Sequence, residues 1–92
     1  MKLNYSNIQV KKAAEFISQN NKYINYSSEY LEEKILDMIR NDFEHIQCLG
    51  LDEYVNGTMG FLYHITRGSE EYSVDIYVNP SVSSSSYEWK SL

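Results

Sequence analysis

The sequence contains few of the residues that build cross-linked or membrane-spanning proteins. Its 92 residues include one cysteine, one proline, four glycines and one tryptophan. The lone Cys48 excludes an intramolecular disulfide, and no apolar run approaches the roughly 18 residues needed to span a bilayer. The first twenty residues carry lysines but no long apolar core or cleavage site, so we expect no secretory signal. The sequence therefore predicts one small intracellular domain, 1–92, that does not contact membranes.

The scarcity of certain residues also argues against most active sites. His45, Cys48 and His64 are the soft metal ligands, and no second pair of cysteines or histidines completes a tetrahedral zinc site. The same three residues are the candidates for nucleophilic catalysis, but nothing places an oxyanion hole or an orienting acid beside them. The four glycines are scattered rather than gathered in a phosphate-binding loop. We expect no enzymatic activity, no metal and no cofactor.

Negative charge is abundant and unevenly distributed. The net charge is -5, but residues 29–88 hold twelve acids and three basic residues, whereas residues 1–22 hold four lysines and one acid. An acidic region of this kind repels nucleic acid and anionic membranes and attracts basic protein surfaces. Direct nucleic-acid binding would depend on Lys2, Lys11, Lys12 and Lys22 against a larger acidic surface, and we do not expect it. Acidity that serves only solubility is the simpler alternative.

Two helices are predicted in the first half of the chain. The first has a capping-box spacing at Ser6 and Gln9 and ends near Gln19. Its apolar stripe is Val10, Ala13, Ala14 and Ile17. The second begins at Ser27 or Ser28, with glutamates near its amide end. Its apolar face is Leu31, Ile35, Met38, Ile39, Phe43 and Ile46, so we expect it to continue to about residue 46.

After Gly50 the apolar period changes from helical to alternating, which predicts strands at 49–55, 58–66 and 71–79. Asn56-Gly57 and residues 67–70 are the expected turns. The serine-rich run 81–86 is typical of a flexible link, after which Tyr87 and Trp89 either form an edge strand or pack back on the fold. The predicted fold class is α+β, with two N-terminal helices packed on one face of a three- to four-stranded antiparallel meander.

Carboxylates are the first group of residues that suggests a functional surface. A helical period places Glu29, Glu33, Asp37 and Glu44 within about 80° of arc, although Arg40 lies in the same arc and can pair with them. The candidate partner-binding residues are Glu29, Glu32, Glu33, Asp37, Glu44, Asp52, Glu53, Glu70, Glu71 and Asp75. A duplex as long as a domain about 30 Å across carries roughly eighteen phosphates. Twelve acids can therefore supply one DNA-like face if most share a side.

Over its full length the chain resembles the anti-restriction nuclease (Arn) proteins of T-even bacteriophages. The resemblance covers the size, the acidic balance and the order of segments, from Met1-Lys2-Leu3-Asn4-Tyr5 through the 29–44 helix to the tyrosine-rich strands. It implies a non-enzymatic DNA mimic, acting as a homodimer in the host cytoplasm. The implied partner is a host modification-dependent restriction endonuclease of the McrBC type, with other basic nucleic-acid-binding proteins as further partners.

An aromatic contact surface is the alternative to DNA mimicry. Nine tyrosines are too many to bury with every hydroxyl satisfied, so some are expected at the surface or in an interface. The candidate anchors of such an interaction module are Tyr23, Tyr26, Tyr77, Tyr87 and Trp89. Binding through them would tolerate salt, whereas binding through carboxylates would not.

Overall fold

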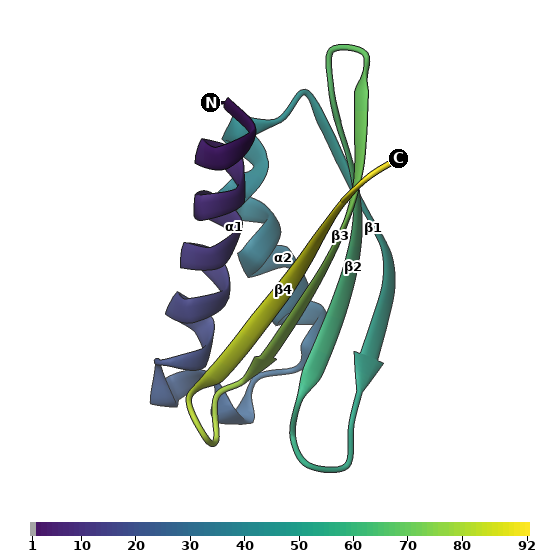
Figure 1. Ribbon diagram of the computed structural model, residues 1–92. Coiled ribbons are helices and arrows are strands. Elements are labelled where there is room, and N and C mark those ends of the chain that lie inside the picture. The colour runs from purple at the N-terminus through teal and green to yellow at the C-terminus, as the bar shows by residue number, and fades with distance from the viewer. Residues whose placement is uncertain (1) are drawn as a thin grey trace.

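The protein is an α+β fold of two layers, with two helices on one side of a four-stranded antiparallel sheet (Figure 1). The computed structural model describes the backbone of residues 2–92 and the side chains from residue 8 onward. Its elements are α1 (Lys2–Ser18), α2 (Ser28–Ile39), β1 (His45–Glu53), β2 (Met59–Arg67), β3 (Glu70–Asn79) and β4 (Ser84–Ser91). Short 3-10 turns at Asn21–Asn25 and Arg40–Asp42 precede and follow α2. The helix–helix–meander order confirms the predicted fold class.

The first helix packs through the predicted stripe. Val10, Ala13, Ala14 and Ile17 are all buried, and α1 lies over β3 and β4. The helix already includes Lys2, so Ser6 lies within it and the predicted start at that residue is wrong. The side chains of Lys2 and Ser6 fall outside the described part of the chain.

The second helix begins where the sequence predicts. The Ser27 hydroxyl accepts a hydrogen bond from the Tyr30 amide at 3.1 Å, which satisfies one of the free amides of the first turn. Leu31, Ile35 and Ile39 are fully buried one helical turn apart. The helix packs against β1 through this face.

The expected continuation of the second helix to Ile46 is wrong. Residues Arg40–Asp42 form a single 3-10 turn, Phe43 is extended, and His45 already pairs with Thr66 in the sheet. Asparagine and aspartate in that turn favour its geometry, because their side chains compete for backbone hydrogen bonds. The first strand consequently begins four residues earlier than the predicted 49–55.

The sheet is a simple meander in the order β1-β2-β3-β4. Gly57 (φ +93°) lies in the predicted β1–β2 turn, and Gly68 (φ +60°) in the two-residue β2–β3 loop, both in the left-handed region that glycine tolerates. The inner face, toward the helices, holds the buried side chains Met59, Phe61, Tyr63, Ile65, Tyr72, Val74, Ile76 and Val78. The predicted one-sided sheet is confirmed.

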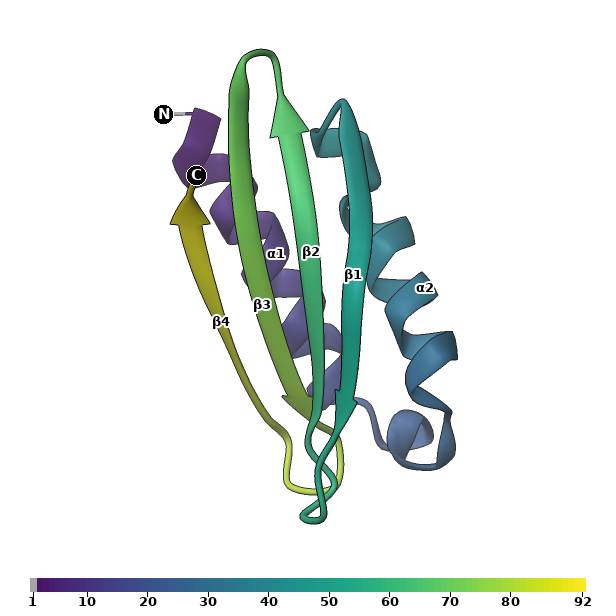
Figure 2. The ribbon, with the colours of Figure 1, turned by 90° about the vertical axis from the view of Figure 1, so that its right-hand side faces the viewer.

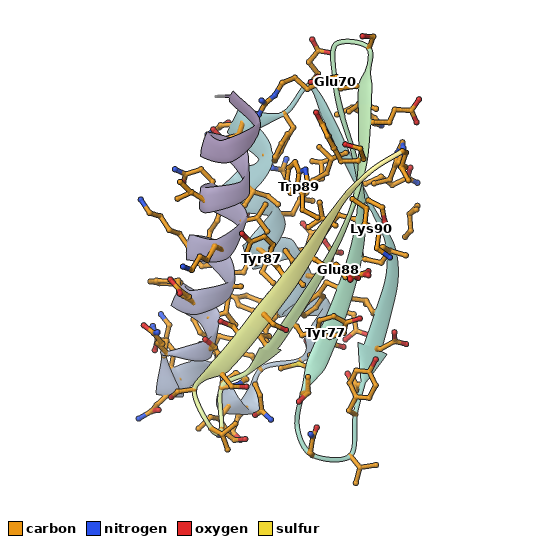
Figure 3. All side chains as sticks on the ribbon, in the orientation of Figure 1. Glu70, Tyr77, Tyr87, Glu88, Trp89 and Lys90 are labelled. Atoms are coloured by element: carbon orange, nitrogen blue, oxygen red, sulfur yellow. The ribbon has the colours of Figure 1, made fainter. Side chains whose placement is uncertain are left out.

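The C-terminal segment is an edge strand. Ser84 and Ser86, expected within a flexible link, pair with Asn79 and Tyr77, so the prediction of a link over 81–86 is wrong for its second half. Figure 3 shows Tyr87 and Trp89 on the helix side of β4 and Glu88 and Lys90 on the other side. Asn79 is buried beside this strand and donates to the Asn56 carbonyl at 3.1 Å, which ties two hairpin tips together.

β1 contains a bulge at Leu49. Cys48 pairs with Tyr63 and Gly50 with Leu62, so the intervening residue has no partner of its own. Up to Cys48 the even-numbered side chains of β1 point toward the helices, and after the bulge the odd-numbered ones do.

In the described part of the chain, 2–92, the helices lack the length and the apolar character that a bilayer-spanning helix requires.

Candidate partner-binding surface

The side of the sheet that faces away from the helices, here called the open face, is uncovered along all four strands (Figure 2). Its side chains lie in rows across the strands: one row is Gly50, Leu62, Asp75 and Glu88, and the next is Asp52, Gly60, Tyr77 and Ser86. Asp52, Asp75 and Glu88 therefore share the open face: Asp75 and Glu88 are direct neighbours on β3 and β4, and Asp52 lies one row away on β1, with β2 between β1 and β3. We call them the sheet acids.

The position of Asp52 depends on the bulge. It pairs with Gly60, which in turn pairs with Tyr77, so it shares the open face with the other two sheet acids. Continuous alternation from Cys48 would direct Asp52 toward the helices instead. The bulge thus adds the third carboxylate to this surface.

Two of the sheet acids face each other directly across neighbouring strands. Asp75 is the register partner of Glu88, which places the two Cβ atoms about 4.5–5.5 Å apart. Lys90 contacts Glu88 at 3.5 Å, and within residues 8–92 neither Asp52 nor Asp75 has an ion-pair partner. Like charges held directly opposite destabilise a sheet, so this arrangement is unfavourable for the isolated protein.

The Tyr77 side chain lies in the negative electrostatic field of these carboxylates. Asp75 raises the pKa of the Tyr77 phenol above its ordinary value, and partial burial, Tyr54, Glu88 and Asp52 add to the increase. The three carboxylates therefore act together on one point of the open face.

An apolar hollow adjoins the sheet acids. An ideal Cβ on Gly60 would lie 3.0 Å from Cε1 of Tyr77 and 3.6 Å from Cε2 of Tyr54, so both rings rest over this glycine. The hollow between them has a volume of about 540 Å³ and is open to solvent. It is lined by Tyr54, Val55, Asn56, Thr58 and Tyr77, and we call it the tyrosine groove.

The predicted acids of the second helix form a separate group. Glu29, Glu33 and Asp37 are exposed at successive turns of α2, opposite its buried face, and we call them the helix acids. Arg40 pairs with Asp37 at 3.0 Å, as its place in the arc predicts, which partly neutralises this stripe. The fourth predicted member, Glu44, is not in the helix; it precedes β1 and accepts a hydrogen bond from the Gly68 amide at 3.0 Å.

Four other candidate acids lie outside both groups. Glu53 accepts a hydrogen bond from the Ser28 hydroxyl, at the start of α2. Glu71 lies 3.0 Å from His64 on the open face, and Glu70 is exposed at the β2–β3 loop. Glu32 is half-buried against the sheet, and burial raises the pKa of its carboxyl.

The candidate acids thus lie on two faces rather than one. The helix acids point away from the sheet, whereas the sheet acids point away from the helices. The Cα atoms extend 38 × 22 × 19 Å, so the protein is an elongated body rather than a sphere about 30 Å across. A duplex of that length carries roughly 22 phosphates. The condition that the sequence analysis set for a single DNA-like face, that most of the acids share a side, is not met.

The sequence prediction omitted two residues of this surface, Glu88 and Tyr54. The alternation of Tyr87 and Trp89 with Glu88 and Lys90 contains the signal for Glu88, because only a strand interpretation points it to the open face. Its pairing with Asp75 needs the β3–β4 register, which the serine-rich turn does not reveal.

Three of the five aromatic residues expected at an interaction surface are directed inward. Tyr23 is 1% exposed, and Tyr87 and Trp89 pack against the core. Tyr26 is 40% exposed and Tyr77 is partly exposed on the open face. The aromatic alternative keeps only these two of its anchors.

A second aromatic group lies on the helix side. The ring centroids of Phe16, Tyr23, Tyr26 and Tyr30 form a chain with successive separations of 6.1, 5.3 and 4.8 Å. Phe16, Tyr26 and Tyr30 are each between 40% and 50% exposed. Aromatic side chains are enriched at protein interfaces.

The described residues contain no group of three histidines, cysteines or acids arranged to hold a metal ion. Cys48 is partly buried, and burial raises the pKa of its thiol, which lowers the thiolate fraction needed for nucleophilic attack.

No protein-family model matches the chain, and no curated protein or solved structure is significantly similar to it.

Proposed function

We propose that the protein binds the DNA-binding site of a basic partner through the sheet acids and thereby competes with DNA. The observation that carries the proposal is the direct cross-strand opposition of Asp75 and Glu88, with Asp52 nearby and Lys90 as the neighbouring cation. This arrangement is unfavourable in the free protein and becomes favourable when a cationic surface covers it. Sites that oppose local stability are typical of functional surfaces.

The narrower proposal concerns the identity of the partner. The resemblance of the sequence to the phage anti-restriction nuclease proteins favours a host restriction endonuclease of the McrBC type, so that binding would protect phage DNA in the host cytoplasm. A homodimer would lengthen the acidic surface beyond the 38 Å of one chain.

The elongated shape supports a partner that surrounds DNA. The two shorter dimensions, 22 and 19 Å, are nearly equal, so the protein approximates a short rod with carboxylates on opposite flanks. A cleft that encloses a duplex presents basic residues to more than one side of it. Such a cleft would engage the sheet acids and, secondarily, the helix acids.

The test compares two matched triple neutralisations in binding to the purified endonuclease. Asp52→Asn, Asp75→Asn and Glu88→Gln together remove the sheet acids; Glu29→Gln, Glu33→Gln and Asp37→Asn remove the same number of charges from the helix acids. We expect the first set to abolish most binding and the second to reduce it modestly.

Salt and DNA provide the complementary measurements. Binding through carboxylates should weaken steeply between about 50 and 200 mM salt and be displaced by duplex DNA. Binding that is indifferent to both would exclude DNA mimicry, as would full binding after removal of the sheet acids.

The row of partly exposed aromatic rings on the helix side favours a second function, that of a protein interaction module. Phe16, Tyr26 and Tyr30 offer apolar rings with little ionic character. Salt-tolerant binding that Tyr30→Ala destroys and the sheet-acid variant preserves would favour this function over DNA mimicry.

A further inference from the structure

We infer that the tyrosine groove receives an arginine side chain from an extended basic segment of the partner protein. The inference rests on the proposed function and identifies the residue type that the open face recognises. Two aromatic rings border the groove, and the sheet acids lie directly beside one of them. An arginine has the two properties that this combination requires, a planar face for the rings and a fixed positive charge for the carboxylates.

The aromatic part of the groove is preformed. The Tyr77 ring lies across Gly60, where any side chain would displace it, and the Tyr54 ring approaches the same glycine. Tyr54 is 48% exposed and Val55 is fully exposed, so no other part of the described chain covers the groove. A guanidinium plane can stack on either ring while its stem contacts Val55.

The charge around the groove specifies the occupant. Asp75 and Glu88 lie opposite each other in one row, and Asp52 lies in the next row, which is the row of Tyr77, with Gly60 between Asp52 and Tyr77. A guanidinium can donate to two carboxylate oxygens at once, whereas an ammonium acts as a point charge. Phosphate-bearing ligands and acidic peptides are repelled by the same carboxylates.

The experiment titrates the full chain with two unstructured peptides of equal length and charge, one alternating arginine and serine and the other lysine and serine. Isothermal titration gives the affinities, and amide chemical shifts locate the site. We expect the arginine peptide to bind about 3- to 10-fold more tightly, as a partly desolvated cation–π contact provides. Its largest shifts should fall at residues 54–60 and 75–77.

Aromatic variants test the groove itself. Tyr54→Leu and Tyr77→Leu should each reduce the arginine preference toward parity while leaving lysine-peptide binding nearly unchanged. Tyr26→Leu, which removes a comparably exposed ring on the helix side, should keep the preference. Tyr54→Leu is the decisive variant if Tyr77→Leu perturbs the fold, because Tyr54 lies in the exposed β1–β2 turn.

Equal affinities for the two peptides, or an arginine preference that survives Tyr54→Leu, would overturn the inference. The endonuclease can still bind in a salt-sensitive manner, and DNA can still displace it, when the peptide results contradict the inference. The proposed function then stands and only the arginine inference fails. If neither the endonuclease nor either peptide binds at low salt, both fail. Self-association that Tyr54→Leu abolishes, measured by sedimentation, would show that a second copy covers the groove and would also overturn the inference.

Discussion

Asp75→Asn should make the free protein more stable while making it a weaker binder. The substitution keeps the shape of the side chain and removes one of two negative charges that oppose each other across β3 and β4. Asp75 has no ion-pair partner within residues 8–92, so replacing its carboxylate by an amide removes no favourable ion pair.

The magnitude follows from the pairing. Favourable cross-strand pairs contribute about 0.2–1 kcal/mol and like charges directly opposite are destabilising, so we take a relief of the same size as the expected gain in the free energy of unfolding. Unfolding 92 residues has an entropy of about 0.19 kcal/mol/K at about 2.1 cal/mol/K per residue, so the midpoint temperature should rise by about 1–5 °C. Salt near 1 M should remove most of the gain, because the Debye length falls to about 3 Å.

Thermal unfolding followed by circular dichroism at low and high salt measures the effect. Glu88→Gln is the matched control: it relieves the same repulsion but also removes the contact with Lys90 at 3.5 Å, so its net change should be close to zero. A loss of stability for Asp75→Asn at low salt would refute the reasoning, since it would mean that the carboxylate is satisfied in the free protein.

Three further substitutions test other parts of the structure. Burial raises the pKa of Glu32 above its ordinary value of 4.5, so the folded state holds this proton more tightly and stability falls as pH rises through the folded pKa. Glu32→Gln should therefore stabilise the protein near neutral pH and lose this advantage below about pH 4, as urea titrations across pH would show. Ser27→Ala should lower the free energy of unfolding by about 1 kcal/mol in the same titrations, because it removes the cap of the second helix. Gly60→Ala should displace the Tyr77 ring by a few tenths of an ångström, since the new methyl would lie 3.0 Å from Cε1, and the ring-current shifts of neighbouring protons would record the displacement. Unchanged shifts would mean that the methyl is accommodated without moving the ring.

Much of the fold can be predicted from local patterns because each pattern has a single physical solution. The Leu31, Ile35 and Ile39 spacing fits only a helix, and Asn56-Gly57 fits only a tight turn. The end of the second helix differs, because Ile46 fits two patterns: with Phe43 it continues the helical period, and with Cys48 it fits an alternating one. Pairing with β2, a contact distant in sequence, decides between them.

The candidate surface was less predictable because it also depends on contacts between residues that are distant in sequence. The helical arc of Glu29, Glu33 and Asp37 follows from 100° per residue and is present. The gathering of Asp52, Asp75 and Glu88 depends on three strand registers and one bulge, none of which leaves a local mark in the sequence.

The bulge at Leu49 fixes which side of the sheet each following residue of β1 occupies. The Leu49 side chain is 57% exposed, and substitutions that preserve the backbone leave the following residues in phase. Deleting this one extra residue would make Cys48 and Gly50 consecutive opposite Tyr63 and Leu62, so the strand would become regular and Asp52 would stay on the open face. Straightening the strand at unchanged length would instead exchange the two sides from Gly50 to Glu53 and turn the Asp52 carboxylate toward the protein interior. Related proteins that share this surface should therefore have either the bulge or a first strand shorter by one residue.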